Sequence, residues 1–354
     1  MKISKSLRRR YALIKGESFP DAVKIFFSSR RDRRAMEAEK FGVPTTTNAL
    51  DEEWYAKTHG LATPSDAAGH YYRHGSTRAL APNPELAGED GITLAQWAVE
   101  FLVRTDVAVG PLGSEAMPPG DARAINPFDI DNPQGKKIAV VTAIFGEFDR
   151  LLPIDPAWLA NADFFAFTDA VLEPSHGWTL VHSAYHNADP RRCARFVKLH
   201  LPTFFSDYDW VFWLDGNVLL CQDPQLVLEA LDSESFDFAT FEHPDRSNLV
   251  AEAAACFNFG KEDPVTLARH LKQHQNHAAF RGTTLYETMV LVLRPSSQHV
   301  RDMCAKWWRS IMRGSKRDQL SLPLAVADTQ GLRVEFLPDS ISRSRFFTKA
   351  THVR

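Results

Sequence analysis

The sequence has few cysteines, no long apolar run and little excess charge, and each absence narrows what the protein can be. Its four cysteines among 354 residues are too widely spaced for a zinc knuckle and too few for a disulfide framework. No uncharged apolar stretch is long enough for a signal peptide or a transmembrane helix, so we expect a cytoplasmic protein. The formal net charge of -3 gives no general reason to expect nucleic acid as a partner.

Two common nucleotide-binding loops are also missing. The first predicted strand, Ile138 to Ala143, is followed by one glycine, Gly146, where a dinucleotide-binding fingerprint needs three. No phosphate-binding Walker sequence occurs in the chain. We therefore expect neither a nicotinamide-dependent dehydrogenase nor a P-loop enzyme.

Positive charge is concentrated at the N-terminus. Up to residue 40 the chain has 12 lysines and arginines against 5 acidic residues. We predict a basic helical arm over residues 1–45, which either rests on the inner face of an anionic membrane or extends into solvent. Residues 46–110 are predicted to form a small helical module, and residues 111–135, rich in Pro, Gly and Asn, a linker.

From residue 136 onward, short apolar segments alternate with helical patterns, as in α/β proteins. Strands are predicted at 138–143, 164–168, 178–183, 210–214, 236–241, 288–293 and 333–337, and helices at 190–204, from 224 and at 296–312. This alternation favours an α/β class with a mixed, mostly parallel sheet flanked by helices, in a domain over residues 136–354.

The most informative motif is Asp215-Gly216-Asn217, which follows the apolar strand from Tyr208 to Leu214. A carboxylate at the carboxyl end of a buried strand lies where α/β proteins bind ligands. Asn217 adds a second oxygen two residues later, a spacing at which two side chains share one cation. The alternative is an ordinary Asp-Gly turn at the end of the strand.

Basic residues are predicted near this strand. Arg195 and Lys198 share one face of the helix at 190–204 and suit a diphosphate, although an exposed helix flank would have the same pattern. Arg246 follows the strand at 236–241 and would either bind a ligand or form an ion pair with Glu252.

Two acidic residues are further candidates. Glu287 directly precedes the strand at 288–293. Asp318 opens a predicted helix, where it is either a site carboxylate or a helix cap.

In this order, the motifs resemble one family. The succession Arg195-x-x-Lys198, Asp215-Gly-Asn217, His243-Pro-Asp-Arg246, Glu287 and Asp318-Gln319 is similar to a glycosyltransferase-like domain, over residues 136–352. That domain is shared by plant cell-wall and mucilage proteins and by bacterial polysaccharide proteins. The resemblance implies a GT-A-like (Rossmann-like) fold. It also implies transfer of a sugar from a nucleotide diphosphate, with a UDP-sugar as the expected donor, to a glycan or lipid-linked acceptor in capsule or other surface-polysaccharide synthesis.

The resemblance also implies donor-binding roles. Asp215, Asn217 and His352, near the end of the chain, would hold Mn²⁺ or Mg²⁺ against the diphosphate. The basic side chains would bind the remaining negative charge of the donor, namely Arg195, Lys198 and Arg246.

On the acceptor side, Glu287 or Asp318 would act as general base in an inverting transfer, whereas a retaining transfer needs neither. Asn217 in place of a second aspartate lowers the negative charge at the metal site. It therefore keeps an alternative open, a degenerate transferase that binds glycans or partner enzymes. A glycoside hydrolase is a weaker third alternative, because it needs two carboxylates flanking the sugar bond.

The small module carries a second resemblance. Leu50-Asp51, Trp54-Tyr55, the stretch from His70 to Gly75, and Pro82-Asn-Pro84 resemble a short segment often appended to bacterial surface-polysaccharide glycosyltransferases. His70 and His74 stand four residues apart and would either bind a metal or pack within the aromatic cluster, and packing is the favoured interpretation.

Overall fold

The computed structural model describes residues 50–75, scattered positions between 78 and 103, and residues 137–352 apart from 147–148, 171, 173, 184 and 282–283. The predicted basic arm and linker lie outside the described residues. Two compact units are present, one of Met1–Leu112 with Phe257–Arg269 and one of Gly113–Cys256 with His270–Arg354. The predicted segment boundaries stay predictions. Within the described part, no helix combines the length and the apolar character needed to cross a membrane.

The described part of the first unit begins with four short helical segments: α4 (Glu52–Thr58), a 3₁₀ turn (Pro64–Asp66), α5 (Ala67–His70) and a π-helical turn (Tyr71–Gly75). The carboxylate of Asp51 caps α4 by accepting a 2.9 Å hydrogen bond from the backbone N–H of Trp54. The Tyr55 hydroxyl lies 3.1 Å from Nδ1 of His70, whose ring centroid is 5.0 Å from that of His74. Both histidines thus lie in the aromatic cluster.

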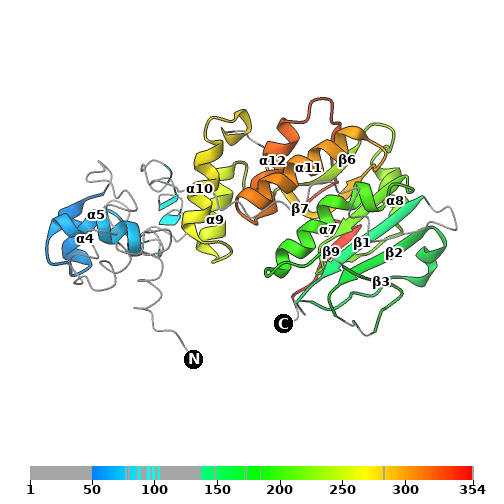
Figure 1. Cartoon of the computed structure of the whole chain (residues 1–354), viewed down its shortest axis with the longest axis horizontal. Coiled ribbons are helices and arrows are strands. Elements are labelled where there is room, and N and C mark those ends of the chain that lie inside the picture. Colours follow the sequence, from blue (N-terminus) through cyan, green and yellow to red (C-terminus); the bar gives the residue numbers. More distant parts are fainter. Residues whose placement is uncertain are drawn as a thin grey trace, which may run out of the picture. The chain divides into compact units, whose positions relative to one another are not determined.

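The second unit contains a seven-stranded sheet in the order β3-β2-β1-β4-β7-β6-β8 (Figure 1). Its strands are β1 (Ile138–Ile144), β2 (Ala162–Thr168), β3 (Thr179–His182), β4 (Trp210–Leu214), β6 (Phe238–Glu242), β7 (Tyr286–Leu293) and β8 (Val334–Phe336). Only β7 runs antiparallel to its neighbours. The predicted mixed, mostly parallel sheet is confirmed.

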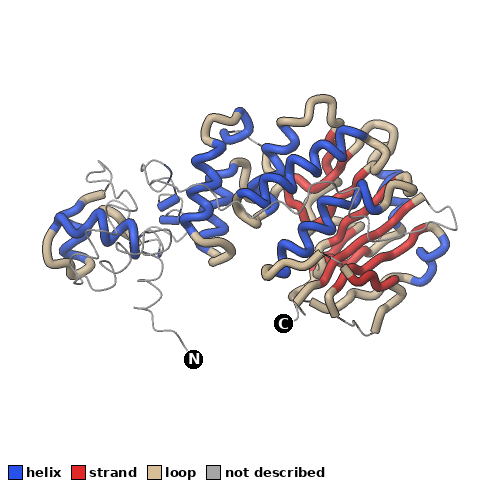
Figure 2. Tube along the Cα trace, in the orientation of Figure 1, coloured by secondary structure: helices blue, strands red, loops and turns tan. Residues whose placement is uncertain are grey.

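The described residues also form helices, which Figure 2 draws in blue. They are α7 (Pro190–Phe204), α8 (Pro224–Ala230), α9 (Leu249–Asn258), α10 (Pro264–His274), α11 (Gln298–Arg313) and α12 (Asp318–Ala327), with 3₁₀ turns at Pro156–Ala160 and Ala278–Arg281. The helix predicted at 190–204 has the predicted limits, because Asp189 caps its first turn with a 3.0 Å bond from the Arg191 N–H and Pro190 suits that turn.

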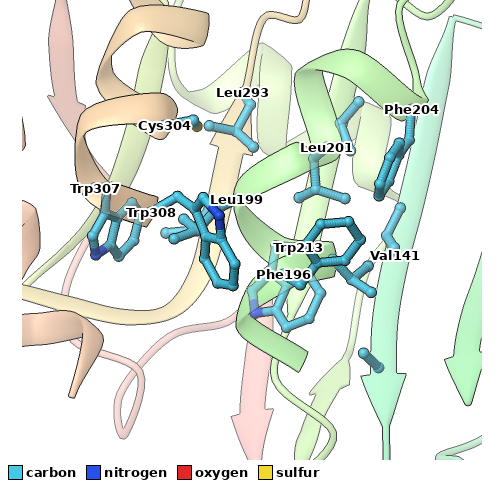
Figure 3. Packing of buried hydrophobic residues seen from close by; sticks show 14 of the residues in the cluster. Val141, Phe196, Leu199, Leu201, Phe204, Trp213, Leu293, Cys304, Trp307 and Trp308 are labelled. Atoms are coloured by element: carbon cyan, nitrogen blue, oxygen red, sulfur yellow. The ribbon is translucent and has the colours of Figure 1, made fainter. Parts of the chain in front are cut away.

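The two faces of the sheet bury different side chains, because successive residues of a strand point to opposite sides. Val141 and Trp213 pack against residues of α7, α11 and α12, including Phe196 and Trp307 (Figure 3). Burying one large apolar side chain stabilises the fold by about 1.5–3 kcal/mol. The opposite face packs against α8 and the segment that ends the chain.

Two features were not predicted. The first is the antiparallel direction of β7. The apolar sequence of a strand that is buried on both sides does not indicate this direction. The second is a two-stranded antiparallel sheet of β5 (Val218–Leu220) and β9 (Phe347–Lys349). This pairing brings the end of the chain back to the turn at Asp215-Gly216-Asn217.

Candidate active site

The predicted site residues meet at one edge of the sheet. β1, β2, β4 and β6 end at this edge, and β7 begins there because it runs in the opposite direction. The backbone N–H of Asp215 donates to the carbonyl of Met289, and that of His243 donates to Leu285, each over 2.8 Å. The segments after β4 and β6 therefore flank the start of β7, at the edge where open α/β sheets bind ligands.

Three side chains hold Asp215. Its Oδ1 accepts a 2.7 Å hydrogen bond from Trp213 Nε1. The same oxygen lies 3.4 Å from Lys198 Nζ and 3.7 Å from Nη1 of Arg195. None of these contacts uses Oδ2, and the side chain is 21% exposed. Asp215 is thus a fixed carboxylate with one oxygen directed away from its protein partners.

Lys198 is fully buried, and its ammonium contacts protein oxygens. Nζ lies 2.7 Å from Oδ2 of Asp318, 2.5 Å from the carbonyl of Thr288 and 3.4 Å from Asp215. An ammonium has three protons, so these three partners account for its donors. In this structure Lys198 therefore connects two carboxylates, and the expected contact with a donor diphosphate stays a prediction without geometric support.

Asp318 is a buried carboxylate that contacts Lys198, Arg195 and Thr288. Its Oδ2 also lies 3.0 Å from Nε of Arg195 and accepts a 2.9 Å hydrogen bond from the Thr288 hydroxyl. Burial by itself would raise the pKa of Asp318, but the surrounding positive charges, led by Arg195 and Lys198, outweigh it and hold the pKa well below its usual range. A carboxyl group with so low a pKa is a poor proton acceptor.

Burial lowers the pKa of Lys198, and the charges of Asp215 and Asp318 oppose this effect. The shift on the lysine favours a neutral amine, whereas the shift on Asp318 favours an ion pair. The 2.7 Å contact between Nζ and Oδ2 supports the ion pair, because a charge-assisted hydrogen bond has this length.

Glu287 differs from Asp318 in its surroundings. Burial raises the pKa of Glu287, and Asp245 and Asp215 raise it further, against the opposing charges of Lys349 and Arg246. Its Oε2 is buried and has no hydrogen-bond partner among the described residues. A carboxylate with a raised pKa at a ligand-binding edge has the properties of a general acid or base.

Arg246 forms the ion pair that the sequence suggested as an alternative. Its Nε donates to Oε2 of Glu252 over 2.7 Å, and Nη2 lies 2.7 Å from Nε2 of His243. The Arg246 side chain nevertheless remains 21% exposed and interacts with Glu287. The ion pair and a ligand-binding role are therefore compatible.

Asn217 and His352 lie together. The Asn217 side-chain amide donates to the Ala350 carbonyl over 3.1 Å and lies 3.4 Å from Nε2 of His352. Nδ1 of His352 is 2.9 Å from a carboxylate oxygen of Asp149, a residue that no sequence motif indicated. A carboxylate at Nδ1 favours the tautomer whose lone pair is on Nε2, as in metal-binding histidines.

The expected metal ligands are compatible with Mn²⁺ or Mg²⁺ in chemistry. Asp215 has a partly exposed carboxylate, and Asn217 and His352 are neighbours. In the described part of the chain, no group of three or more His, Cys, Asp and Glu residues is arranged to hold a metal ion. A hard cation bound by few protein groups takes its remaining ligands from substrate phosphates and water. These residues therefore fit a cation that is bound jointly with a diphosphate.

Comparison with known proteins identifies a family model that matches part of the chain. Residues 177–352 match the model of the TOD1/MUCI70 glycosyltransferase-like domain. The curated "Probable hexosyltransferase MUCI70" of Arabidopsis thaliana is 26% identical over 234 residues, covering 55% of this chain and 39% of the plant protein. The chain thus spans about two fifths of the length of that relative.

Solved structures of glycosyltransferases also match part of the chain. The apo structure of the bifunctional glycosyltransferase WbbM is 13% identical, with a TM-score of 0.33 over 57% of this chain and 39% of that one. GlyE of Streptococcus pneumoniae TIGR4 is 14% identical, with a TM-score of 0.32 over 58% of this chain and 46% of that one. Similarity at this level does not inform the assignment of individual site residues.

Proposed function

Because residues 177–352 form a domain of the TOD1/MUCI70 glycosyltransferase-like family, we propose that the protein transfers a sugar from a nucleotide diphosphate to a hydroxyl group of an acceptor. The proposed acceptor is a glycan or a lipid-linked acceptor, in surface-polysaccharide synthesis. The observation that carries the proposal is Asp215, whose Oδ1 is held by side chains of β4 and α7 while Oδ2 remains unused at the ligand-binding edge.

Fixing one oxygen of Asp215 determines where the other points. Hydrogen-bond donors that are already in place need no reorganisation when the nucleotide sugar binds. Lys198 and Asp318 serve this purpose from the interior, because both are buried and are bonded to each other. We therefore assign Asp215 to donor binding, with Asn217 and His352 beside it.

A departing nucleotide diphosphate gains negative charge, which must be offset. A divalent cation held by Asp215, Asn217 and His352 would supply part of this positive charge when bound. Arg246 supplies charge from the protein, since its guanidinium is partly exposed beside the start of β7. Arg195 is only 14% exposed and contributes mainly through its contacts with Asp215 and Asp318.

In the transfer step, the acceptor oxygen forms a bond to the anomeric carbon of the donor sugar. The bond between that carbon and the diphosphate oxygen breaks, and its electron pair remains on the diphosphate. The acceptor hydroxyl loses its proton to Glu287, whose raised pKa suits this role better than the depressed pKa of Asp318. This assignment corresponds to an inverting transfer.

Calorimetry of the full chain with a panel of UDP- and GDP-sugars, each with and without Mn²⁺, tests the proposal. We expect one donor to bind in a metal-linked manner and to be consumed when an acceptor glycan is added. Binding of glycan with no binding of any nucleotide sugar would instead support the degenerate, non-catalytic alternative.

A further inference from the structure

The loop after β6 is tied to a buried carboxylate. Glu252, on α9, is 1% exposed, and its two oxygens have separate partners. Oε2 accepts from Nε of Arg246 over 2.7 Å, and Oε1 accepts from the thiol of Cys256 over 3.3 Å. Because Glu252 is buried, it acts on a ligand through the side chains that it contacts, and of these Arg246 is more exposed than His243.

The guanidinium of Arg246 is oriented by its hydrogen bond to Glu252 and by its packing beside His243. Besides the bond to Glu252, Nη2 lies 2.7 Å from Nε2 of His243. Nδ1 of the same histidine accepts from the backbone N–H groups of Asp245 and Arg246, each over 3.1 Å, and so fixes the turn that carries the arginine. This places the proton of the neutral imidazole on Nε2, so Nε2 is a close neighbour of Nη2 and does not accept a hydrogen bond from it. One guanidinium nitrogen, Nε, is thus bonded to Glu252, and a second, Nη2, lies against His243. None of these contacts uses Nη1.

The stability of the fold alone does not explain why Glu252 and Arg246 form this ion pair. Taking a carboxylate out of water is costly, and apolar residues of similar volume often stabilise a core at least as well. The buried guanidinium of Arg317 also interacts with Glu252, so this carboxylate has a second cation nearby. An arginine held in one orientation, in contrast, loses little side-chain entropy when an anion binds.

We propose that Glu252 is a positioning residue that presents Arg246 to the diphosphate of the donor. This inference rests on the proposed sugar-transfer function. The inference explains why Glu252 is buried as a charged group although the transfer step does not use it. Any effect of Glu252 on the affinity for the donor should then require Arg246.

The test is a double-mutant cycle, with binding of UDP and of GDP to the full chain measured by calorimetry. We expect Arg246→Gln and Glu252→Gln each to weaken binding of the preferred nucleotide about tenfold or more, as for loss of a hydrogen bond to a charged group. The double variant should bind no more weakly than Arg246→Gln alone. Additive losses, or wild-type affinity in a folded Glu252→Gln protein, would overturn the inference.

Two further variants separate positioning from charge and from folding. Arg246→Lys keeps the positive charge but lacks the planar guanidinium, so it should weaken nucleotide binding to a similar degree as Arg246→Gln. Wild-type affinity in Arg246→Lys would contradict the inference, and this test does not require Glu252→Gln to fold. Glu229→Gln removes a carboxylate on the exposed part of α8 and should change nothing. A folded wild-type chain that binds neither nucleotide would instead refute the proposed function, and the inference with it.

Discussion

The indole Nε1 of Trp213 donates a 2.7 Å hydrogen bond to Oδ1 of Asp215, two residues further along the chain. Residues two apart in a strand project from the same side of the sheet. Trp213 is buried among α7, α11 and α12, so Asp215 emerges on the side that these helices cover. This relationship explains why the carboxylate meets Lys198 and Arg195 of α7.

Replacing Asp215 should abolish transfer without unfolding the protein. In Asp215→Asn, Trp213, Lys198 and Arg195 lose the negative charge that they contact, and we expect kcat to fall by about 10²–10³-fold, as when one preorganised electrostatic contact is lost. Initial rates with the preferred donor and circular dichroism provide the measurement. Asp302→Asn, on the exposed face of α11, is the control. Full activity in Asp215→Asn would remove Asp215 from the site.

Loss of Lys198 should mainly affect stability. Lys198→Met leaves the buried Asp318 without its shortest ion pair, and we expect the free energy of unfolding to fall by about 3–5 kcal/mol in urea denaturation. Lys316→Met removes a partly exposed ion pair with Asp189 and should cost less than about 1 kcal/mol. Equal losses in the two variants would argue against a buried ion pair at Lys198.

The acid sensitivity of the fold should depend on Asp318. Because its pKa is lowered in the folded protein, the stability it contributes is present above the ordinary pKa of an aspartate and is lost as the pH falls through the folded-state pKa. Asp318→Asn should therefore show a weaker dependence of unfolding free energy on pH in the acid range than the wild type. An unchanged dependence would contradict the assignment.

Glu287→Gln should lower activity and raise stability. The raised pKa of Glu287 means that the folded state favours the protonated form, so the stability it contributes is lost as the pH rises through the folded-state pKa. At neutral pH the variant should have a higher Tm than the wild type and a kcat lower by about 10²–10⁴-fold. The rise in wild-type kcat with pH should also occur above the usual range for a glutamate.

The exposed Glu335→Gln provides the matched control for that variant. Neither its Tm nor its kcat should change. Wild-type activity in Glu287→Gln would exclude a role for Glu287 as base and would favour a retaining transfer.

Metal and nucleotide should bind together. Asp215, Asn217 and His352 offer a single carboxylate, so we expect weak binding of MnCl₂ to the chain alone and binding at least about tenfold tighter once UDP is present. Calorimetry with MnCl₂, in the presence and absence of UDP, measures the difference. Asn217→Asp should tighten binding of MnCl₂ alone. Equal affinity with and without UDP would argue against a shared site.

Several parts of the site could be predicted from local sequence. Asp215 follows an apolar strand, and Arg195 and Lys198 lie three residues apart on a capped helix, so strand and helix periodicity were enough to place them. Glu287 was predicted just before its strand and is instead the second residue of β7. In each case the signal lies within a few residues, where backbone geometry decides which side chains share a face.

Other parts depend on contacts between distant segments. Asp149 has no motif around it and reaches His352 only because β9 pairs with β5. The position of Asp318 in the sequence is typical of a helix cap. In the structure its carboxylate is instead buried beside Thr288 of β7 and Lys198 of α7. Pairing of this kind depends on how the whole sheet and its helices pack.

The amino-acid sequence by itself determined the α/β class and the family resemblance, and it predicted a candidate site at the end of β4, because periodicity and motif order are local properties. The tertiary structure decided which candidates face the edge of the sheet and which are buried behind it. It separated Glu287, with its raised pKa, from Asp318, with its lowered one, although both are acidic residues close to an element start. The physical reason is that a pKa depends on burial and on charges within a few ångströms, and these are set only when distant segments pack together.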